Sequence, residues 1–253
     1  MINFMTKHKP QFWNDLVFAD VNTEADLYPF VTGARADHIL LHGPFGTGKS
    51  TTAAIIAGKG KVHKWTQKIS VASPDLNDTI VNFHYKSASA IGLFNSGNPI
   101  GIVEEIDQLT IHQQFLFRQV MDDCDAARFI FTTNHLASVD PGIRSRATPF
   151  LMELPIPKQW LPRAHAILNS EGVAATDAEI LHQIGQYKGD MRSTIRALED
   201  MVKILATSPI SPQNGLSSTV APLPAGTSVT KRIRNKKLVR PAATVGQLLG
   251  KTP

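Results

Sequence analysis

A glycine-rich stretch at residues 43–50 carries the clearest chemistry in the sequence. It reads Gly-Pro-Phe-Gly-Thr-Gly-Lys-Ser and fits the phosphate-binding pattern G-x-x-x-x-G-K-S/T. Such glycines let the backbone curl so that successive N–H groups point at phosphate oxygens, and a following helix offers its positive end to the same anion. We therefore predict a nucleotide site formed by Gly43, Pro44, Gly46, Thr47, Gly48, Lys49, Ser50 and Thr51.

Two side chains of this loop are suited to the far end of a nucleotide. Lys49 would reach the terminal phosphates, and Ser50 would offer its hydroxyl to magnesium. The alternative is a glycine-rich turn that fits the pattern by accident. The apolar run in residues 38–42 and the helix-forming residues 51–57 disfavour that alternative, because a phosphate loop joins a strand to a helix.

A second chemical cluster follows the apolar residues 100–103, which we expect to form a strand. Glu104 and Glu105 come directly after this run, and Asp107 follows them. One carboxylate at such a place can lie near magnesium, and another can polarise an attacking water. Adjacent acids on a solvated helix would have no such meaning, so the strand before them favours a second half of the nucleotide site.

Residues 127–133 predict another strand, rich in β-forming side chains, and Asn134 stands at its end. In an open parallel sheet, ligands lie beyond the carboxyl ends of the strands. Asn134 would therefore join the phosphate loop and Glu105 on one rim, where its amide could hold the attacking water. The alternative is an ordinary asparagine turn at the end of a strand.

The remaining pattern predicts the elements that must position these groups. We expect an α/β nucleotide-binding domain with a central parallel sheet over residues 1–155, because strands and helices alternate there. A unit of three helices over residues 156–206 follows, since strand patterns cease near residue 155. The other expected segments are helices at 23–32 (with Thr23 as a possible cap and Gly33 as the stop), 75–91 and 110–123, strands at 69–72 and 149–154, and helices at 158–171, 176–187 and 190–206.

Two segments leave their roles open. Residues 7–18 are basic and aromatic, and they either strap Trp13 onto the core or clasp an adenine ring. Arg144 and Arg146 lie in a segment opened by Pro and Gly, and by themselves they could be solvated charges.

Composition excludes several classes of protein. With 253 residues, of which 42% are hydrophobic, the chain can bury one α/β core and a small second unit. No apolar run approaches the roughly 20 residues of a membrane span, and residues 1–7 lack the apolar region of a secretion signal. The single cysteine, Cys124, excludes an internal disulfide and a cysteine-built metal site. We expect a cytoplasmic protein with no membrane partner.

Charge is distributed unevenly along the chain. Residues 1–206 hold 19 Lys and Arg against 21 Asp and Glu, a net charge of −2, whereas residues 207–253 hold 7 basic residues and no acid. The body therefore has no overall field that attracts nucleic acid. Residues 207–253 are rich in Pro, Ser and Gly, which predicts a disordered linker and tail. Its basic stretch, residues 231–240, is either a DNA- or RNA-binding arm or a solubilising tail, and residues 244–249 could dock on a partner.

Taken together, these stretches resemble the AAA+ ATPases, and within them most closely the small ATPase subunits of sliding-clamp loaders, including those of tailed phages. The resemblance runs from Lys7 to about Ala206. Residues 43–50 resemble the Walker A loop, and Val103-Glu104-Glu105-Ile106-Asp107 resembles the Walker B acids. Five further segments resemble motifs of the family in the same order. Residues 10–17 resemble the adenine-side opening, residues 114–122 resemble the helix that follows in clamp loaders, and residues 132–134 resemble sensor 1. Residues 143–146 resemble the arginine-finger motif, and residues 189–192 resemble sensor 2.

The resemblance implies ATP and magnesium as ligands, with Ser50 and Glu104 on the metal side. It also implies that Glu105 orients and polarises the water that attacks the γ-phosphate, and that Asn134 helps to place this water. The fold that it implies is a P-loop α/β module followed by a small lid of three helices. Glu104 stands where the family usually has Asp, which could slow hydrolysis.

Two arginines acquire roles from the same resemblance. Arg192 would touch the γ-phosphate of its own subunit, and Arg146 would supply positive charge to the site of a neighbouring subunit. Hydrolysis would then require an oligomer. Ala147 stands where clamp loaders commonly have Cys, and we expect no helical collar after the lid.

The function implied is ATP-driven loading or remodelling of a protein partner on DNA during replication, in a bacterial cytoplasm if the source is viral. The implied partners are further copies of the chain or related AAA+ subunits, DNA, and a sliding clamp or another replication protein. Two alternatives remain. One is another AAA+ machine, such as a helicase loader or ring translocase, and the other is an ATP-stabilised assembly scaffold with little hydrolysis.

Overall fold

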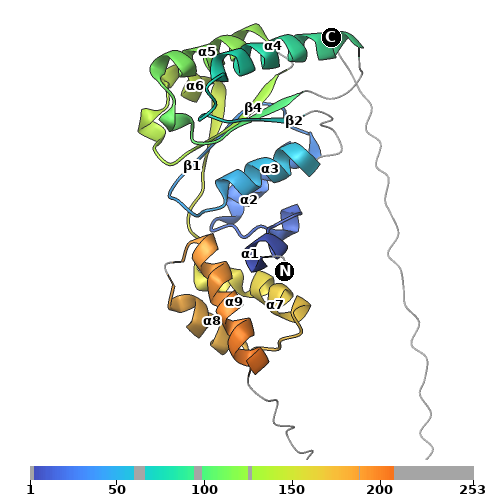
Figure 1. Ribbon diagram of the computed structural model, residues 1–253, viewed down its shortest axis with the longest axis vertical. Helices are drawn as coiled ribbons and strands as arrows, with labels where there is room; N and C mark the ends of the chain where they lie inside the picture. The colour runs from blue at the N-terminus through green and yellow to red at the C-terminus, as the bar shows by residue number, and fades with distance from the viewer. Residues whose placement is uncertain (1–2, 60–65, 94–98, 125–126, 188, 208–253) are drawn as a thin grey trace, which may run out of the picture. The chain divides into compact units, whose positions relative to one another are not determined.

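The structure is a computed structural model that describes residues 3–59, 66–93, 99–124, 127–187 and 189–207 (Figure 1). These residues belong to one compact unit, residues 1–209. The predicted linker and basic tail lie outside the described residues, except for Thr207, which ends a helix. Among the helices described, none combines the length and apolar character that crossing a bilayer requires.

A five-stranded parallel sheet forms the centre of the fold, as the sequence predicted, with the strand order β2-β3-β4-β1-β5. Its strands are β1 (His38–His42), β2 (Thr66–Ile69), β3 (Ile100–Val103), β4 (Arg128–Thr133) and β5 (Ala147–Leu151). The predicted strands at 69–72 and 149–154 were both placed a few residues too late. Both are edge strands, in which exposed positions dilute the apolar pattern that marks the central strands.

Helices cover both faces of the sheet (Figure 1). On one face, α4 (Leu76–Leu93), α5 (Ile111–Asp123) and α6 (Pro141–Arg146) pack on a cluster that includes Leu40 and Phe131. On the other face, α2 (Val21–Thr32) and α3 (Lys49–Lys59) pack on a cluster that includes Ile39 and Leu41. Successive residues of β1 thus point to opposite cores, which explains why the central strands read as continuous apolar runs.

The start of α2 corrects the predicted cap. The helix begins at Val21 because the carboxylate of Asp20 accepts the backbone N–H groups of Asn22 and Thr23. Thr23 therefore lies inside the first turn instead of capping it. The predicted stop is confirmed, since Gly33 has a φ of 78° in the left-handed region that favours glycine.

Helix α6 was not predicted, although its sequence contains the signals. Asp140 is the N-cap, and its carboxylate accepts the N–H groups of Gly142 and Ile143. Pro141 stands in the first turn, where its missing N–H carries no penalty. The two arginines of this segment therefore lie on a short, capped helix and not in a loop.

The three predicted helices of the second half are present as α7 (Leu161–Ser170), α8 (Asp177–Gly185) and α9 (Met191–Thr207), preceded by the 3₁₀ turn η4 (Pro157–Trp160). We call α7, α8 and α9 the lid. They enclose a third apolar cluster that includes Trp160 and Leu198. The division of the chain into domains at residue 155 stays a prediction.

The N-terminal segment, with α1 (Phe4–Lys7) and η1 (Trp13–Asp15), packs as a strap. Trp13 is 9% exposed, and its ring lies 5.1 Å from that of Phe18, which confirms the packing interpretation. The strap is also fastened to the lid, because Arg163 of α7 pairs with Asp15 at 2.6 Å. Val17 belongs to the apolar cluster of the lid, whereas Trp13 belongs to that of the sheet, so the strap joins the two cores.

His38 opens β1 as a neutral hydrogen-bond acceptor. Its Nδ1 accepts the backbone N–H of Phe129 at 3.1 Å, and the two rings stack. Burial, followed by the nearby charge of Arg128, lowers the pKa of His38 to about 4. The folded chain therefore resists protonation of a group that the unfolded chain protonates near its ordinary pKa of about 6.5.

We expect His38 to make stability pH-dependent between pH 6.5 and 4. The contribution of His38 to the free energy of unfolding is complete above its pKa in the unfolded chain. It is lost as the pH falls towards the pKa in the folded chain, by roughly 3 kcal/mol in total. Urea unfolding at several pH values measures this loss. The matched variant is His38→Gln, whose amide oxygen can accept the same N–H but does not titrate; equal acid sensitivity in the two proteins would contradict the assignment.

Candidate nucleotide site

The phosphate loop adopts the predicted strand–loop–helix arrangement between β1 and α3. Gly46 and Gly48 have φ values of 79° and 86°, in the left-handed region where a side chain is strained. Both glycines also pack against the lid. A Cβ on Gly46 would lie 2.5 Å from the Cβ of Asp190, and one on Gly48 would lie 2.6 Å from the sulfur of Met191. A side chain at either position would therefore force Asp190 or the end of the Met191 side chain to shift.

Lys49 is buried at the centre of this loop, with 7% of the residue exposed. Its ammonium donates hydrogen bonds to the carbonyl oxygens of Gly43 at 2.9 Å and Pro44 at 2.6 Å. Burial lowers the pKa of Lys49 to about 8, although the negative charges of Asp107 and Glu105 oppose this shift. The ammonium is thus held inside the loop by two backbone carbonyls, and the charges of two carboxylates act on it.

The hydroxyls of the loop divide into buried and exposed groups. Thr47 is buried and donates to the Pro44 carbonyl at 3.1 Å, whereas Ser50, in the first turn of α3, is exposed. Among the described residues, no three His, Cys, Asp or Glu side chains gather into a metal cluster. Magnesium fits the oxygen donors that are present, because it is commonly held by one or two protein oxygens together with substrate phosphates.

The loop after β3, residues 104–108, is the acid loop. Glu105 has a φ of 56°, the one non-glycine residue with a positive φ in the described part of the chain. Its backbone N–H donates to the hydroxyl of Thr132 at 3.1 Å, and its carboxylate accepts from the amide of Gln108 at 2.5 Å. Such strained backbone persists where its surroundings hold it, which is common at functional sites.

Glu104 and Asp107 lie in different environments. Glu104, the predicted metal ligand, forms an ion pair with Lys68 of the neighbouring strand β2. Asp107 accepts a 2.8 Å hydrogen bond from the hydroxyl of Thr133, and its charge acts on Lys49. The predicted site did not include Asp107, although its place as the third acid after β3 was the signal that could have revealed it.

Asn134 lies at the end of β4, as predicted, and is half-buried. The next residue, His135, donates its backbone N–H to the Thr133 hydroxyl at 2.9 Å. Its ring meets the exposed ring of Phe45 edge-on, with centroids 6.3 Å apart. The segment that carries Asn134 therefore contacts the phosphate loop directly.

Three predicted site segments thus share one rim of the sheet. The phosphate loop follows β1, the acid loop follows β3 and Asn134 follows β4, and these strands are adjacent in the order β3-β4-β1. A pocket beside the phosphate loop is lined by residues 17–20, Thr23, Thr47 and residues 151–153. The strap therefore reaches the site as one wall of this pocket.

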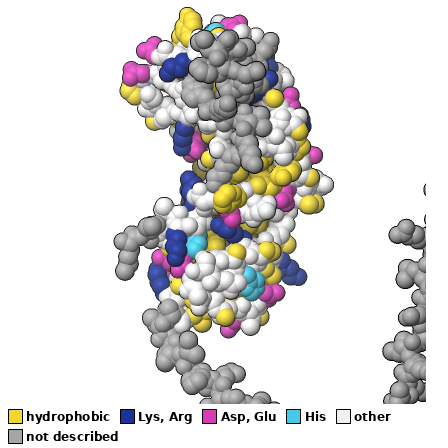
Figure 2. All heavy atoms as spheres, turned by 90° about the vertical axis from the view of Figure 1, so that its right-hand side faces the viewer, with side chains coloured by type: hydrophobic (Ala, Val, Ile, Leu, Met, Phe, Trp, Pro, Cys, Tyr) yellow, Lys and Arg dark blue, Asp and Glu magenta, His cyan; other side chains and the backbone are white. Residues whose placement is uncertain are grey.

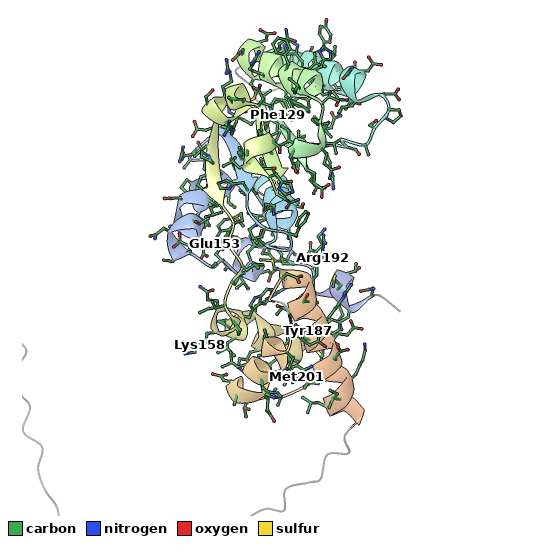
Figure 3. All side chains as sticks on the ribbon, turned by 90° about the vertical axis from the view of Figure 1, so that its left-hand side faces the viewer. Phe129, Glu153, Lys158, Tyr187, Arg192 and Met201 are labelled. Carbon is green, nitrogen blue, oxygen red and sulfur yellow. The ribbon has the colours of Figure 1, made fainter. Side chains whose placement is uncertain are left out.

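Arg192 enters the site region from the lid, at the start of α9 (Figure 3). Asp190 precedes the helix, and its carboxylate accepts the backbone N–H of Arg192 at 3.0 Å. The N–H of Met191 donates to the Gly46 carbonyl at 2.9 Å. One hydrogen bond therefore joins the first turn of α9 to the phosphate loop. Arg192 directly follows Met191, the residue that makes this bond.

Arg146 is not brought into this rim. From the end of α6, its guanidinium binds both carboxylate oxygens of Asp122, at 2.5 and 2.9 Å, and donates to the Gly142 carbonyl at 2.9 Å. The hydrogen bond to Asp122 raises the pKa of Arg146, and the same bond lowers that of Asp122. The pair is exposed at the α5–α6 surface.

Gln114 fixes the position of α6. Its buried amide donates to the carbonyl oxygens of Leu109 and Ser138, both at 3.2 Å, and accepts the N–H of Asp140 at 2.7 Å. Asp140 in turn caps α6. One side chain therefore ties the end of the acid-loop segment to the helix that carries Arg146.

Charges of both signs are distributed over the described surface. Figure 2 shows Lys and Arg side chains interspersed with Asp and Glu on the face towards the viewer. This agrees with the near-neutral charge of residues 1–206 in the sequence.

Comparison with known proteins supports the interpretation of the fold. Residues 39–154 match the model of the family described as "ATPase family associated with various cellular activities (AAA)". The chain is 28% identical over 203 residues to replication factor C subunit 5 of Homo sapiens, covering 78% of this chain and 59% of that one. It is 29% identical over 207 residues to the replication factor C small subunit of Thermoplasma acidophilum, covering 79% and 64%. The chain thus spans about three fifths of the length of these relatives.

A solved structure shares the fold. The RuvB Holliday junction branch migration motor of Thermotoga maritima aligns with a TM-score of 0.59 and 19% identity, over 81% of this chain and 68% of that one. At this identity the likeness establishes the fold of the chain and nothing further.

Replacing Gln114 by Met is expected to destabilise the chain by roughly 2–4 kcal/mol, because one buried and two partly buried hydrogen bonds to backbone groups are lost. His112→Met on the exposed side of the same helix is the matched control, and we expect it to change the free energy of unfolding by less than about 0.5 kcal/mol. Urea unfolding of both variants measures the difference. A Gln114→Met protein as stable as the control would show that water replaces these bonds at no cost.

Proposed function

We propose that this chain, which carries an AAA domain over residues 39–154, is an ATP hydrolase of the clamp-loader type. It would couple ATP binding and hydrolysis, within an oligomer of like subunits, to loading or remodelling a protein partner on DNA during replication. The observation that carries the proposal is the gathering of the phosphate loop, the acid loop and Asn134 on adjacent strand ends. The similarity to replication factor C small subunits supports the clamp-loader type.

Binding of ATP would begin at the phosphate loop. The backbone N–H groups between Gly46 and Ser50 and the positive end of α3 would surround the phosphates, and Lys49 would exchange its carbonyl partners for phosphate oxygens. Magnesium, when bound, would neutralise charge that develops on the β- and γ-phosphates. Ser50 would hold it, with Glu104 as the proposed acidic partner.

Hydrolysis would then proceed by in-line attack of water on the γ-phosphorus. Glu105 would orient this water and accept its proton, the new oxygen–phosphorus bond would form, and the bond to the bridging oxygen would break to release ADP and phosphate. One carboxylate oxygen of Glu105 is occupied by Gln108 in this structure, which leaves the other for water. Asn134 would hold the water from the opposite side.

The two arginines would act from different subunits. Arg192 begins the helix whose first turn contacts the phosphate loop, so it would sense the γ-phosphate of its own subunit. Arg146 would leave Asp122 and place its charge at a neighbour's γ-phosphate, where the transition state accumulates negative charge. Partner subunits, DNA and a cytoplasmic location belong to this proposal. Cys124 is a buried free cysteine, which fits a reducing compartment.

The proposal predicts that Glu105→Gln lowers the rate of ATP hydrolysis by roughly 100-fold or more while ATP binding changes little, because the general base is lost and the phosphate loop is kept. Steady-state hydrolysis and binding of a fluorescent ATP analogue measure the two quantities. Glu199→Gln on the surface of α9 is the matched control. Equal rates for Glu105→Gln and the wild type would remove Glu105 from the mechanism.

The same variant tests assembly by native mass spectrometry with ATP, magnesium and primed DNA. We expect an open pentamer, or a smaller open set that awaits another subunit, because ATP is retained and Arg146 needs a neighbour's site. A closed hexamer would favour a ring translocase or helicase loader instead. A persistent monomer would contradict the role of Arg146.

Lys49 predicts a pH dependence of ATP binding. Its pKa of about 8 in the free chain means that the ammonium is charged at neutral pH, and bound phosphates would raise that pKa. Above pH 8, binding must take up a proton, so the dissociation constant is expected to rise by up to about tenfold per pH unit. Titration with the fluorescent analogue from pH 7 to pH 9.5 measures the slope. The slope should vanish in Lys49→Arg, which stays charged; a flat wild-type profile would contradict the prediction.

A further inference from the structure

Thr133, the last residue of β4, occupies a position between two parts of the candidate site. The residue is 0% exposed. Its hydroxyl donates to a carboxylate oxygen of Asp107 at 2.8 Å and accepts the backbone N–H of His135 at 2.9 Å. A single oxygen atom therefore joins the acid loop to the segment that carries Asn134.

Only a hydroxyl can make both bonds from this place. It has one hydrogen to donate and lone pairs to accept with, whereas a carboxylate oxygen cannot donate and an aliphatic side chain can do neither. Valine has nearly the same shape as threonine and would fill the same buried space without either bond. Serine keeps both bonds and loses one methyl group.

The adjacent residue strengthens the link on the other face of the strand. Thr132 accepts the backbone N–H of Glu105 at 3.1 Å, so two consecutive hydroxyls of β4 fasten the acid loop at two points. Neighbouring residues of a strand point to opposite faces, and the loop is therefore held from both sides. This bracing accounts for the strained backbone of Glu105, whose φ of 56° requires support.

Thr133 also lies next to the phosphate loop through the sheet. It is the register partner of His42, the residue that directly precedes Gly43. Asp107, which Thr133 holds, is the first of the two acids whose charge acts on Lys49, whereas Glu104 is paired with Lys68. The carboxylate that Thr133 bonds is thus the one whose charge acts most on Lys49 of the phosphate loop.

We propose that Thr133 is a positioning residue that holds Asp107 and the Asn134 segment as one unit for hydrolysis. The inference rests on the proposed ATPase function and deepens it. Without the hydroxyl, the acid loop and the Asn134 segment lose their shared fixed point, and the attacking water loses its fixed geometry. ATP binding depends on the phosphate loop, whereas the Thr133 hydroxyl bonds Asp107 and His135, so we expect binding to be retained.

Thr133→Val and Thr133→Ser in the full chain test this role. We expect Thr133→Val to lower kcat about tenfold or more, while its dissociation constant for a fluorescent ATP analogue stays within about threefold of the wild-type value. We expect the kcat of Thr133→Ser to lie within about threefold of the wild-type value. Thr132→Val is the comparison at the neighbouring hydroxyl. Wild-type kcat in a folded Thr133→Val protein would overturn the inference, as would an equal loss in Val and Ser.

A second measurement does not depend on ATP. The amide of His135 should exchange its hydrogen faster in Thr133→Val than in Thr133→Ser, because only Ser keeps its acceptor. Unchanged exchange in Thr133→Val would overturn the inference even if the chain proved to have no ATPase activity. A wild-type chain that neither binds nor hydrolyses ATP would instead overturn the proposed function, so the two failures are distinguishable.

Asp107→Leu removes the same link from the other side and serves if Thr133→Val does not fold. We expect it to lower kcat as Thr133→Val does. In that background, Thr133→Val should lower kcat no further. Independent, multiplying losses would show that Thr133 does not act through Asp107.

Discussion

The parallel pairing of β4 with both β1 and β3 is the constraint on which the site depends. In this register His42 lies opposite Thr133, and Val103 lies opposite Phe131, so the three strands end at nearly the same level. Each strand end is followed by a segment with different chemistry: a phosphate loop, an acid loop and an amide. A shift of one residue in either pairing would turn Thr132 and Thr133 to the wrong faces and release both of the acid loop's anchors.

The lid is joined to the sheet domain through the phosphate loop and through the strap. The start of α9 touches the phosphate loop itself, through the Met191–Gly46 hydrogen bond. At the other side, the strap contributes Val17 to the lid core and Trp13 to the sheet core, and Asp15 pairs with Arg163. A change in the phosphate loop would therefore reach the lid directly through the Met191–Gly46 hydrogen bond, while the strap connects the core of the lid to that of the sheet.

Two charges with proposed roles in the site are paired inside the free chain. Arg146 is bound to Asp122 by a bidentate contact, and Glu104 is paired with Lys68. Both pairs are at least partly exposed, so each costs little to break, because solvent screens the attraction. Phosphate oxygens or a metal ion would compete with these partners directly. In the free chain, Asp122 and Lys68 thus hold the charged groups of Arg146 and Glu104 in defined positions.

The sequence by itself determined the fold class, the phosphate loop, the central strands and the ends at which Asn134 and Glu105 lie. These features follow from local signals. Glycine spacing sets the backbone geometry of the loop, and long apolar runs are buried whatever their neighbours are, so neither depends on particular tertiary partners. The bounds of the edge strands were predicted a few residues too late, and helix α6 was not predicted. The apolar patterns of these elements are short, and the start of α6 is set by a single side chain, Asp140. Only the tertiary structure decided which acids act on the charge of Lys49, that Thr133 joins two loops, and that Arg146 is held by Asp122. Each of these depends on side chains that different strands, helices or loops bring together in space, and spacing along the chain does not encode such proximity.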